Sequence, residues 1–120
     1  MTMAQYGTVL VFEDNPLVAM DAEETLRGKG FRRVIAASSE AAALDFANEE
    51  RLDFALVAAT ILDGAGAAIA ARLAARSIPF AFSCNFADGS DIPEGWSGTP
   101  YLIRPYSEQD VSALLAGLRI

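Results

Sequence analysis

The polar residues best placed for chemistry follow short apolar segments, at points where buried strands are expected to end. Glu13 and Asp14 follow the segment TVLVF at residues 8–12, and Arg104 follows YLI at residues 101–103. Adjacent carboxylates can bind a cation such as Mg²⁺, and a guanidinium pairs with carboxylates or phosphates. Two further apolar segments end in Ala58 and Cys84. Ala58 thus places an unreactive methyl group where an α/β protein usually carries its chemistry.

Strand and helix patterns alternate along the chain. Strands are expected at residues 8–12, 33–37, 54–58, 78–84 and 101–103, which are short runs of mostly apolar residues. Helices are expected from residue 16 to about 29, from Ser38 or Ser39 to about 48, from the turn at residues 63–66 to about 76, and from residue 107 onward. Capping residues support these limits: Asp14 or Asn15, Gly28 or Gly30, Ser38 or Ser39, and the pair Ser107 and Asp110.

This alternation predicts an α/β fold. Strands joined by helices through short connections favour a parallel sheet covered on both faces, a three-layer α/β/α sandwich. The flavodoxin-like strand order 2-1-3-4-5 is the common one for five strands. Residues 85–100 contain two prolines and three glycines, so a fourth helix is expected to be short or missing. At 120 residues the chain is expected to form a single domain, residues 1–120.

The composition of the chain argues against some kinds of partner and indicates a cellular compartment. The net charge of −7, the pI near 4.4 and the lack of a Lys/Arg-rich run argue against nucleic acid and membrane partners. We find no apolar segment long enough to span a bilayer and no signal peptide. The only cysteine is Cys84 and there is no histidine, which excludes a structural zinc site and fits the reducing cytoplasm.

In their order and spacing, the residues at the strand ends resemble a response-regulator receiver domain, and the resemblance covers essentially the whole chain. The acidic pair after the first strand corresponds to Glu13 and Asp14. The phosphoacceptor aspartate, five residues after an acidic residue such as Asp53, corresponds to Ala58. The family's Thr or Ser at the end of the fourth strand corresponds to Cys84, five residues after Pro79. Its lysine corresponds to Arg104 in Arg104-Pro105-Tyr106, and its aromatic switch residue corresponds to Tyr101, three residues before Arg104.

The reactive groups depart from those that the resemblance implies. In the family an aspartate accepts a phosphoryl group from a kinase histidine, and Mg²⁺ is held by the acidic pair, that aspartate and a backbone carbonyl, here of Thr60. A lysine and a Thr or Ser then hold the phosphate. Ala58 offers no oxygen nucleophile, so the chain resembles a degenerate pseudo-receiver that cannot be phosphorylated at this position.

We therefore expect Arg104 to pair with Glu13, Asp14 or both, in place of the metal and the lysine. No cofactor is expected, and a weak Mg²⁺ site at Glu13 and Asp14 is the alternative. A second alternative is an Mg²⁺-dependent receiver that uses Asp14 or Asp63 as its acceptor. Asp63 is more simply a solvated turn residue, and Glu13–Asp14 could also serve only as an acidic helix start. Cys84 is interpreted as a small buried apolar residue rather than a reactive thiol.

The sequence thus predicts a phosphorylation-independent protein–protein interaction module in two-component signalling, and not an enzyme. Expected partners are a histidine kinase, another regulator or a second copy of the chain. In the family, the fourth helix, the fifth strand and the last helix form dimer and target surfaces. Here that surface would use Tyr101, Tyr106 and the last helix, and Tyr101 would be either a conformational switch or simply a core residue.

Overall fold

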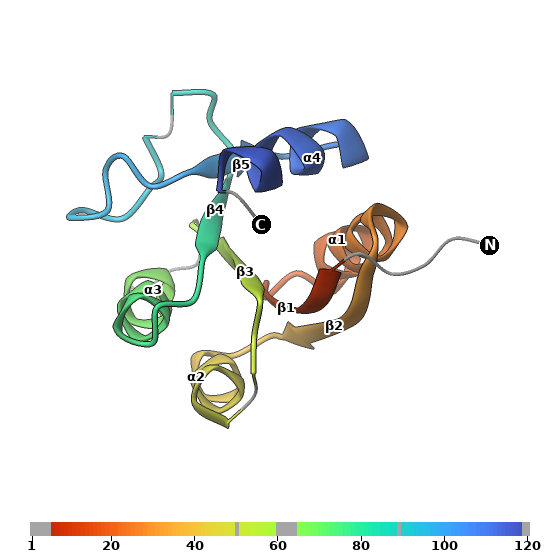
Figure 1. The fold of residues 1–120 in the computed structure, drawn as a ribbon. Helices are drawn as coiled ribbons and strands as arrows, with labels where there is room; N and C mark the ends of the chain where they lie inside the picture. The colour runs from red at the N-terminus through yellow and green to blue at the C-terminus, as the bar shows by residue number, and fades with distance from the viewer. Residues whose placement is uncertain (1–5, 50, 60–64, 89, 119–120) are drawn as a thin grey trace.

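A computed structural model describes residues 6–49, 51–59, 65–88 and 90–118. Figure 1 shows the described elements arranged around one central sheet. Their order along the chain is β1 (Tyr6–Phe12), α1 (Pro16–Lys29), β2 (Phe31–Ala37), α2 (Glu40–Glu49), β3 (Phe54–Ala58), α3 (Ala65–Ala75), β4 (Phe80–Cys84), β5 (Tyr101–Ile103) and α4 (Glu108–Gly117). All neighbouring strands are parallel, and their order is β2-β1-β3-β4-β5. The predicted flavodoxin-like fold and strand order are confirmed.

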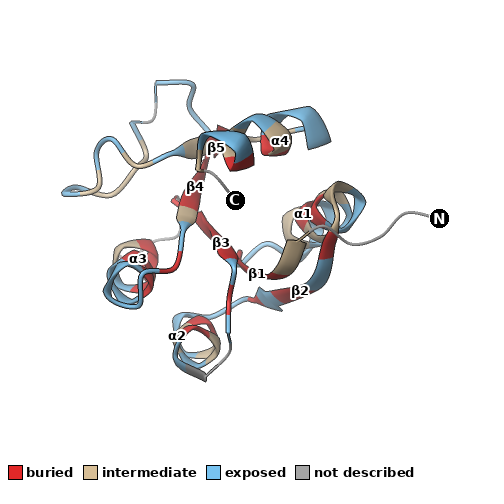
Figure 2. Cartoon of the chain, in the orientation of Figure 1, coloured by how far each residue is buried: buried red, intermediate tan, exposed pale blue. Residues whose placement is uncertain are grey.

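Helices cover both faces of the sheet, with α1 and α4 on one face and α2 and α3 on the other (Figure 1). Successive side chains of a strand point to opposite faces, so the sheet separates two apolar cores. Phe12, Val57 and Phe82 pack towards α2 and α3, whereas Val11 and Leu56 pack towards α1 and α4. In Figure 2 the strands are mostly buried, while the outer faces of the helices are exposed. No helix within the described ranges is long and apolar enough to cross a bilayer.

Local hydrogen bonds decide between the alternative helix caps. Asn15, rather than Asp14, begins α1, because its Oδ1 accepts hydrogen bonds from the N–H groups of Leu17 and Val18. Gly30, rather than Gly28, ends that helix with a left-handed φ of 118°, a conformation that favours glycine. Ser39 caps α2 through the N–H of Ala42, and the predicted capping box of Ser107 and Asp110 is confirmed at α4.

Several element limits differ from the sequence prediction. β1 begins two residues earlier, at Tyr6, whose N–H donates to Gly30 and whose ring stacks on Phe31 with centroids 5.0 Å apart. β2 also begins at Phe31, two residues before its predicted start. β4 begins at Phe80 rather than residue 78. The reason is that Pro79 has no N–H to donate, although its carbonyl still accepts from Ala55.

The segment between β4 and β5 contains no helix in its described residues, 85–88 and 90–100. It consists of turns, with positive φ angles at Gly95 and Gly98. Trp96 holds the segment to the sheet, because its ring contacts Phe80 edge to face with centroids 5.6 Å apart. The expectation of a short or missing fourth helix is therefore confirmed for this part of the chain, and β5 lacks a helical cover on that side.

Candidate functional site

The carboxyl ends of four adjacent strands meet at one edge of the sheet. The register pairs Phe12 with Val57, so Glu13 follows β1 beside Ala58 at the end of β3. Ala58 pairs with Ser83, and Cys84 pairs with Ile103, directly before Arg104. The fold thus brings Glu13, Ala58, Cys84 and Arg104 to the same end of the sheet, and these four residues are together named here the strand-end pocket. Asp53 lies at the opposite end of β3, where it accepts a hydrogen bond from the N–H of Thr8.

An ion pair joins the first and last strands across the strand-end pocket. The Nη1 atom of Arg104 lies 2.6 Å from Oε1 of Glu13, and the two side chains are only 14% and 6% exposed. The other carboxylate oxygen, Oε2, accepts the N–H of Asn15 at 3.1 Å. The Nη2 atom of Arg104 lies 3.5 Å from the carbonyl oxygen of Ser83. The predicted pairing of Arg104 with Glu13 is confirmed, and both oxygens of that carboxylate are engaged.

Burial dominates the electrostatics of Glu13. Loss of solvation raises the pKa of its carboxyl, because a buried carboxylate loses the water that stabilises its charge. The Asn15 N–H and the Arg104 guanidinium lower the pKa, and the neighbouring Asp14 raises it again. Asp14 itself is exposed to solvent. The acidic pair is therefore divided into one buried, ion-paired carboxylate and one solvated carboxylate.

Ala58 is fully buried and brings only a methyl group to the pocket. Helix α3 lies close to it, because a Cβ atom added to Gly66 would lie 3.1 Å from the Ala58 carbonyl oxygen. This close approach explains why a residue without a side chain stands at Gly66. Thr60 and Asp63, which the sequence placed at the same edge, lie outside the described residues.

The described residues do not fit the Mg²⁺ that the fold family implies. Mg²⁺ requires several hard oxygen ligands in octahedral geometry. The guanidinium of Arg104 bonds to one oxygen of Glu13, the N–H of Asn15 bonds to the other, and the side chain of Ala58 supplies no oxygen. Within the described ranges, no three Asp, Glu, Cys or His side chains gather as a metal site would require.

Cys84 is fully buried at the end of β4. Burial raises the pKa of its thiol to about 12, with the carboxylate of Asp91 as the next contribution. A thiol with this pKa carries almost no thiolate at neutral pH, and the thiolate is the reactive form. The position is consistent with the interpretation of Cys84 as a small buried apolar residue.

Asp91 is the residue near the pocket that the sequence reasoning missed. It comes from the segment between β4 and β5, where its Oδ2 accepts the N–H of Asn85 at 2.7 Å. Its other carboxylate oxygen is buried. The hydroxyl of Ser83, beside Ala58 in the sheet, is buried as well. Nothing in the sequence identifies these positions, because the segment has no periodicity and the turn joins residues six apart.

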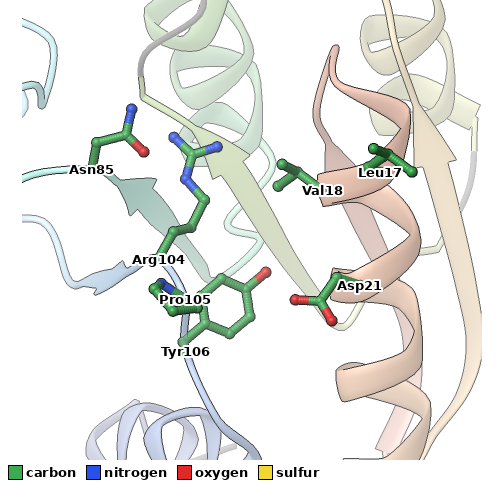
Figure 3. Close-up of a pocket in the computed structure, with 7 residues that line it drawn as sticks. All are labelled: Leu17, Val18, Asp21, Asn85, Arg104, Pro105 and Tyr106. Atoms are coloured by element: carbon green, nitrogen blue, oxygen red, sulfur yellow. The ribbon is translucent and has the colours of Figure 1, made fainter.

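The two candidate interface tyrosines lie on opposite faces of the sheet. Tyr101 is half-buried against the core that contains Cys84, and its hydroxyl donates to the Ala87 carbonyl at 3.1 Å. Tyr106 packs towards α1 and α4, where burial raises the pKa of its hydroxyl. Figure 3 shows Tyr106 between Pro105 and Asp21 of α1, at a pocket of about 390 Å³. That pocket is lined by Leu17, Val18, Asp21, Asn85, Arg104, Pro105 and Tyr106.

Solved structures identify the family. The chain is similar to SdrG from Sphingomonas melonis Fr1, with 30% identity over 98% of this chain and 100% of that chain, and a TM-score of 0.80. The BeF₃-activated conformation of SdrG is similar at 28% identity over the full length of both chains, with a TM-score of 0.79. A CheY-like response regulator receiver domain from Methylobacillus flagellatus has 20% identity, covers 95% of this chain and 99% of its own, and has a TM-score of 0.77.

No protein-family model and no curated protein matches the chain by sequence. The structural matches, together with the strand order and the position of the strand-end pocket, nevertheless define the class. The chain belongs to the response-regulator receiver family of two-component signalling proteins.

Proposed function

We propose that this receiver domain acts as a phosphorylation-independent protein–protein interaction module in a two-component pathway of the cytoplasm. One observation supports the proposal: Ala58, where the family resemblance puts the phosphoacceptor, is fully buried, and the neighbouring Glu13 is paired with Arg104. A methyl group cannot attack a phosphoryl group, and the paired Glu13 carboxylate is not available to a metal. The domain itself then catalyses no reaction.

The signal in this proposal is carried by contact rather than by covalent modification. The partner is a histidine kinase, another regulator or a second copy of the chain. The contact surface consists of the segment before β5, β5 itself and α4, with Tyr101 and Tyr106 at its borders. Its support is the uncovered flank of β5 and the partial exposure of Ile103, a large apolar residue that is 38% exposed.

The test is incubation of the purified chain with a small-molecule phosphodonor and Mg²⁺, followed by intact mass measurement. We expect no added phosphoryl group on the natural chain. A matched variant, Ala58→Asp with Cys84→Thr and Arg104→Lys, restores the oxygen nucleophile, the hydroxyl and the lysine that the family uses. We expect this variant to gain a labile phosphoryl group, which verifies that the assay detects one.

A phosphoryl group on the natural chain would contradict the proposal and support the alternative, an acceptor at Asp14 or Asp63. The variants Asp14→Asn and Asp63→Asn then separate the two positions, because only loss of the true acceptor abolishes the added mass. Asp14 is accessible, since it is exposed beside the ion pair.

A further inference from the structure

The sheet has an open edge at β5, the last strand in the order. The N–H of Phe82 donates to the Pro100 carbonyl, and the N–H of Arg104 donates to the Cys84 carbonyl. In a parallel pair, alternate residues of a strand bond to the same neighbour. The main-chain groups of Tyr101 and Ile103 therefore point away from β4, towards the open edge.

A groove runs beside this edge. It has a volume of about 700 Å³ and lies between α4 and the segment formed by β5 and residues 104–105. Its lining residues are Tyr101, Leu102, Ile103, Arg104, Pro105, Asp110, Ala113 and Leu114. A strand edge facing a helix across an apolar groove is the arrangement into which extended peptides add as a further strand. Main-chain hydrogen bonds then supply affinity, and alternate side chains enter the groove.

The opposite edge of the sheet differs in its side chains. β2 carries Arg32 and Arg33, both exposed, and charged residues on an edge strand hinder pairing with another strand. β5 has the apolar sequence Tyr101-Leu102-Ile103 and no charge of its own. Only the β5 edge therefore presents an apolar strand for pairing.

The charge of the protein indicates which kind of peptide segment would bind in the groove. Two charged residues line the groove: Asp110, and Arg104, whose guanidinium is buried against Glu13. The whole chain has 16 acidic and 9 basic residues. An acidic surface attracts a basic partner and repels a second copy of a chain whose net charge is −7.

We propose that the groove between β5 and α4 binds an extended, basic peptide segment of a protein partner as an added sixth strand. This inference rests on the proposed function and makes it more specific, because it gives the partner segment a conformation and a charge. The main-chain groups of Tyr101 and Ile103 pair with the peptide, its apolar side chains lie against Ala113 and Leu114, and a basic side chain faces Asp110.

The probe is a peptide of alternating lysine and valine, Lys-Val-Lys-Val-Lys-Val-Lys with blocked ends, titrated into isotope-labelled protein. We expect the amide NMR signals of Tyr101, Ile103 and Leu114 to shift, and the affinity to fall as salt is added. The same peptide with N-methyl groups on its internal residues keeps its charge and side chains but cannot donate along either edge. It is expected to bind at least roughly tenfold more weakly, as the loss of one to two hydrogen bonds implies.

Two variants of the protein test the edge itself. Ile103→Pro removes an outward N–H without removing a bond to β4, because the N–H that donates to β4 at that end of the strand belongs to Arg104. It is expected to weaken peptide binding by about tenfold. Ile103→Thr keeps the N–H and should bind within about threefold of the natural chain. Thermal unfolding of both variants verifies that the fold is retained.

Equal binding of the parent and N-methylated peptides would overturn strand addition, as would shifts confined to α1 or no shift at millimolar peptide. Shifts at β5 that depend on protein concentration, without peptide, would assign the edge to a second copy and overturn the peptide as occupant. The phosphodonor experiment stays independent of these results. If the natural chain takes up no phosphoryl group and the peptide fails to bind, only the strand addition is lost.

Discussion

The strand-end pocket and the β5–α4 groove meet at Arg104 but differ in every physical respect. In the pocket, Ala58 and Cys84 are fully buried, and Glu13 is paired with the guanidinium of Arg104. In the groove, a strand edge and the partly exposed Ile103 face solvent beside Asp110. The difference separates an end of the sheet whose charged groups pair with each other from an edge whose main-chain groups face solvent.

The largest expected effect concerns the strand-end pocket: the labelling rate of the Cys84 thiol should differ greatly between native and unfolded protein. With a pKa of about 12, only ~10⁻⁴ of the thiol is ionised at pH 8. A thiol-specific disulfide reagent is expected to label native protein no faster than the protein unfolds, whereas denaturant-unfolded protein labels at once. The measurement compares the labelling rate with the unfolding rate. Complete labelling of the native chain faster than unfolding would show that the pocket opens.

The next largest effect is the loss of stability when the Arg104–Glu13 ion pair is broken. Arg104→Met leaves the Glu13 carboxylate buried without its cation, which is expected to lower the free energy of unfolding by about 3 kcal/mol at pH 7. The double variant with Glu13→Gln removes the orphaned charge and should recover most of this loss. Denaturant unfolding measures both values.

Matched controls separate this effect from the loss of a charge in general. Arg72→Met removes an exposed cation from α3 and should change the stability by less than about 0.5 kcal/mol. An equally small change in Arg104→Met would contradict the view that the pocket is held closed by its ion pair.

The smallest predicted effect is the pH dependence of Glu13. Its pKa is raised by burial above the ordinary value of 4.5, so the folded state binds the proton more tightly than the unfolded state. Its contribution to stability is therefore fully present below pH 4.5 and is lost as the pH rises through the raised pKa. Relative to Glu13→Gln, the natural chain should lose stability over that interval, by at most about 1.4 kcal/mol per pH unit. Denaturant unfolding at several pH values measures this, and an opposite slope would show that Arg104 outweighs burial.

Much of the fold could be predicted from local patterns. β3 and β5 have the predicted limits, because each is a short apolar run bounded by turn or polar residues. The capping box at Ser107 was also predictable, since it depends on residues three apart. Element starts were less accurate, because the pairing of Tyr6 with Gly30 and Phe31 joins residues that are distant in sequence.

The residues of the candidate site that directly follow or end a strand could be predicted from the sequence. Glu13, Ala58, Cys84 and Arg104 could be placed together because parallel strands bring their carboxyl ends to one edge. Asp91 could not, because a turn without periodicity positions its carboxylate beside Asn85. The groove beside β5 was equally hidden, since it depends on the distance between a strand and a helix.

The sequence by itself determined that the side chain at position 58 has no oxygen, that the chain is acidic and that its strand and helix patterns alternate as in a receiver domain. Those properties are written in residue types and in spacings along the chain. Only the tertiary structure decided that Glu13 is a partner of Arg104 and is buried, whereas Asp14 is exposed. The physical reason is that charge pairing and burial depend on distances between residues up to 91 positions apart, which no local pattern records.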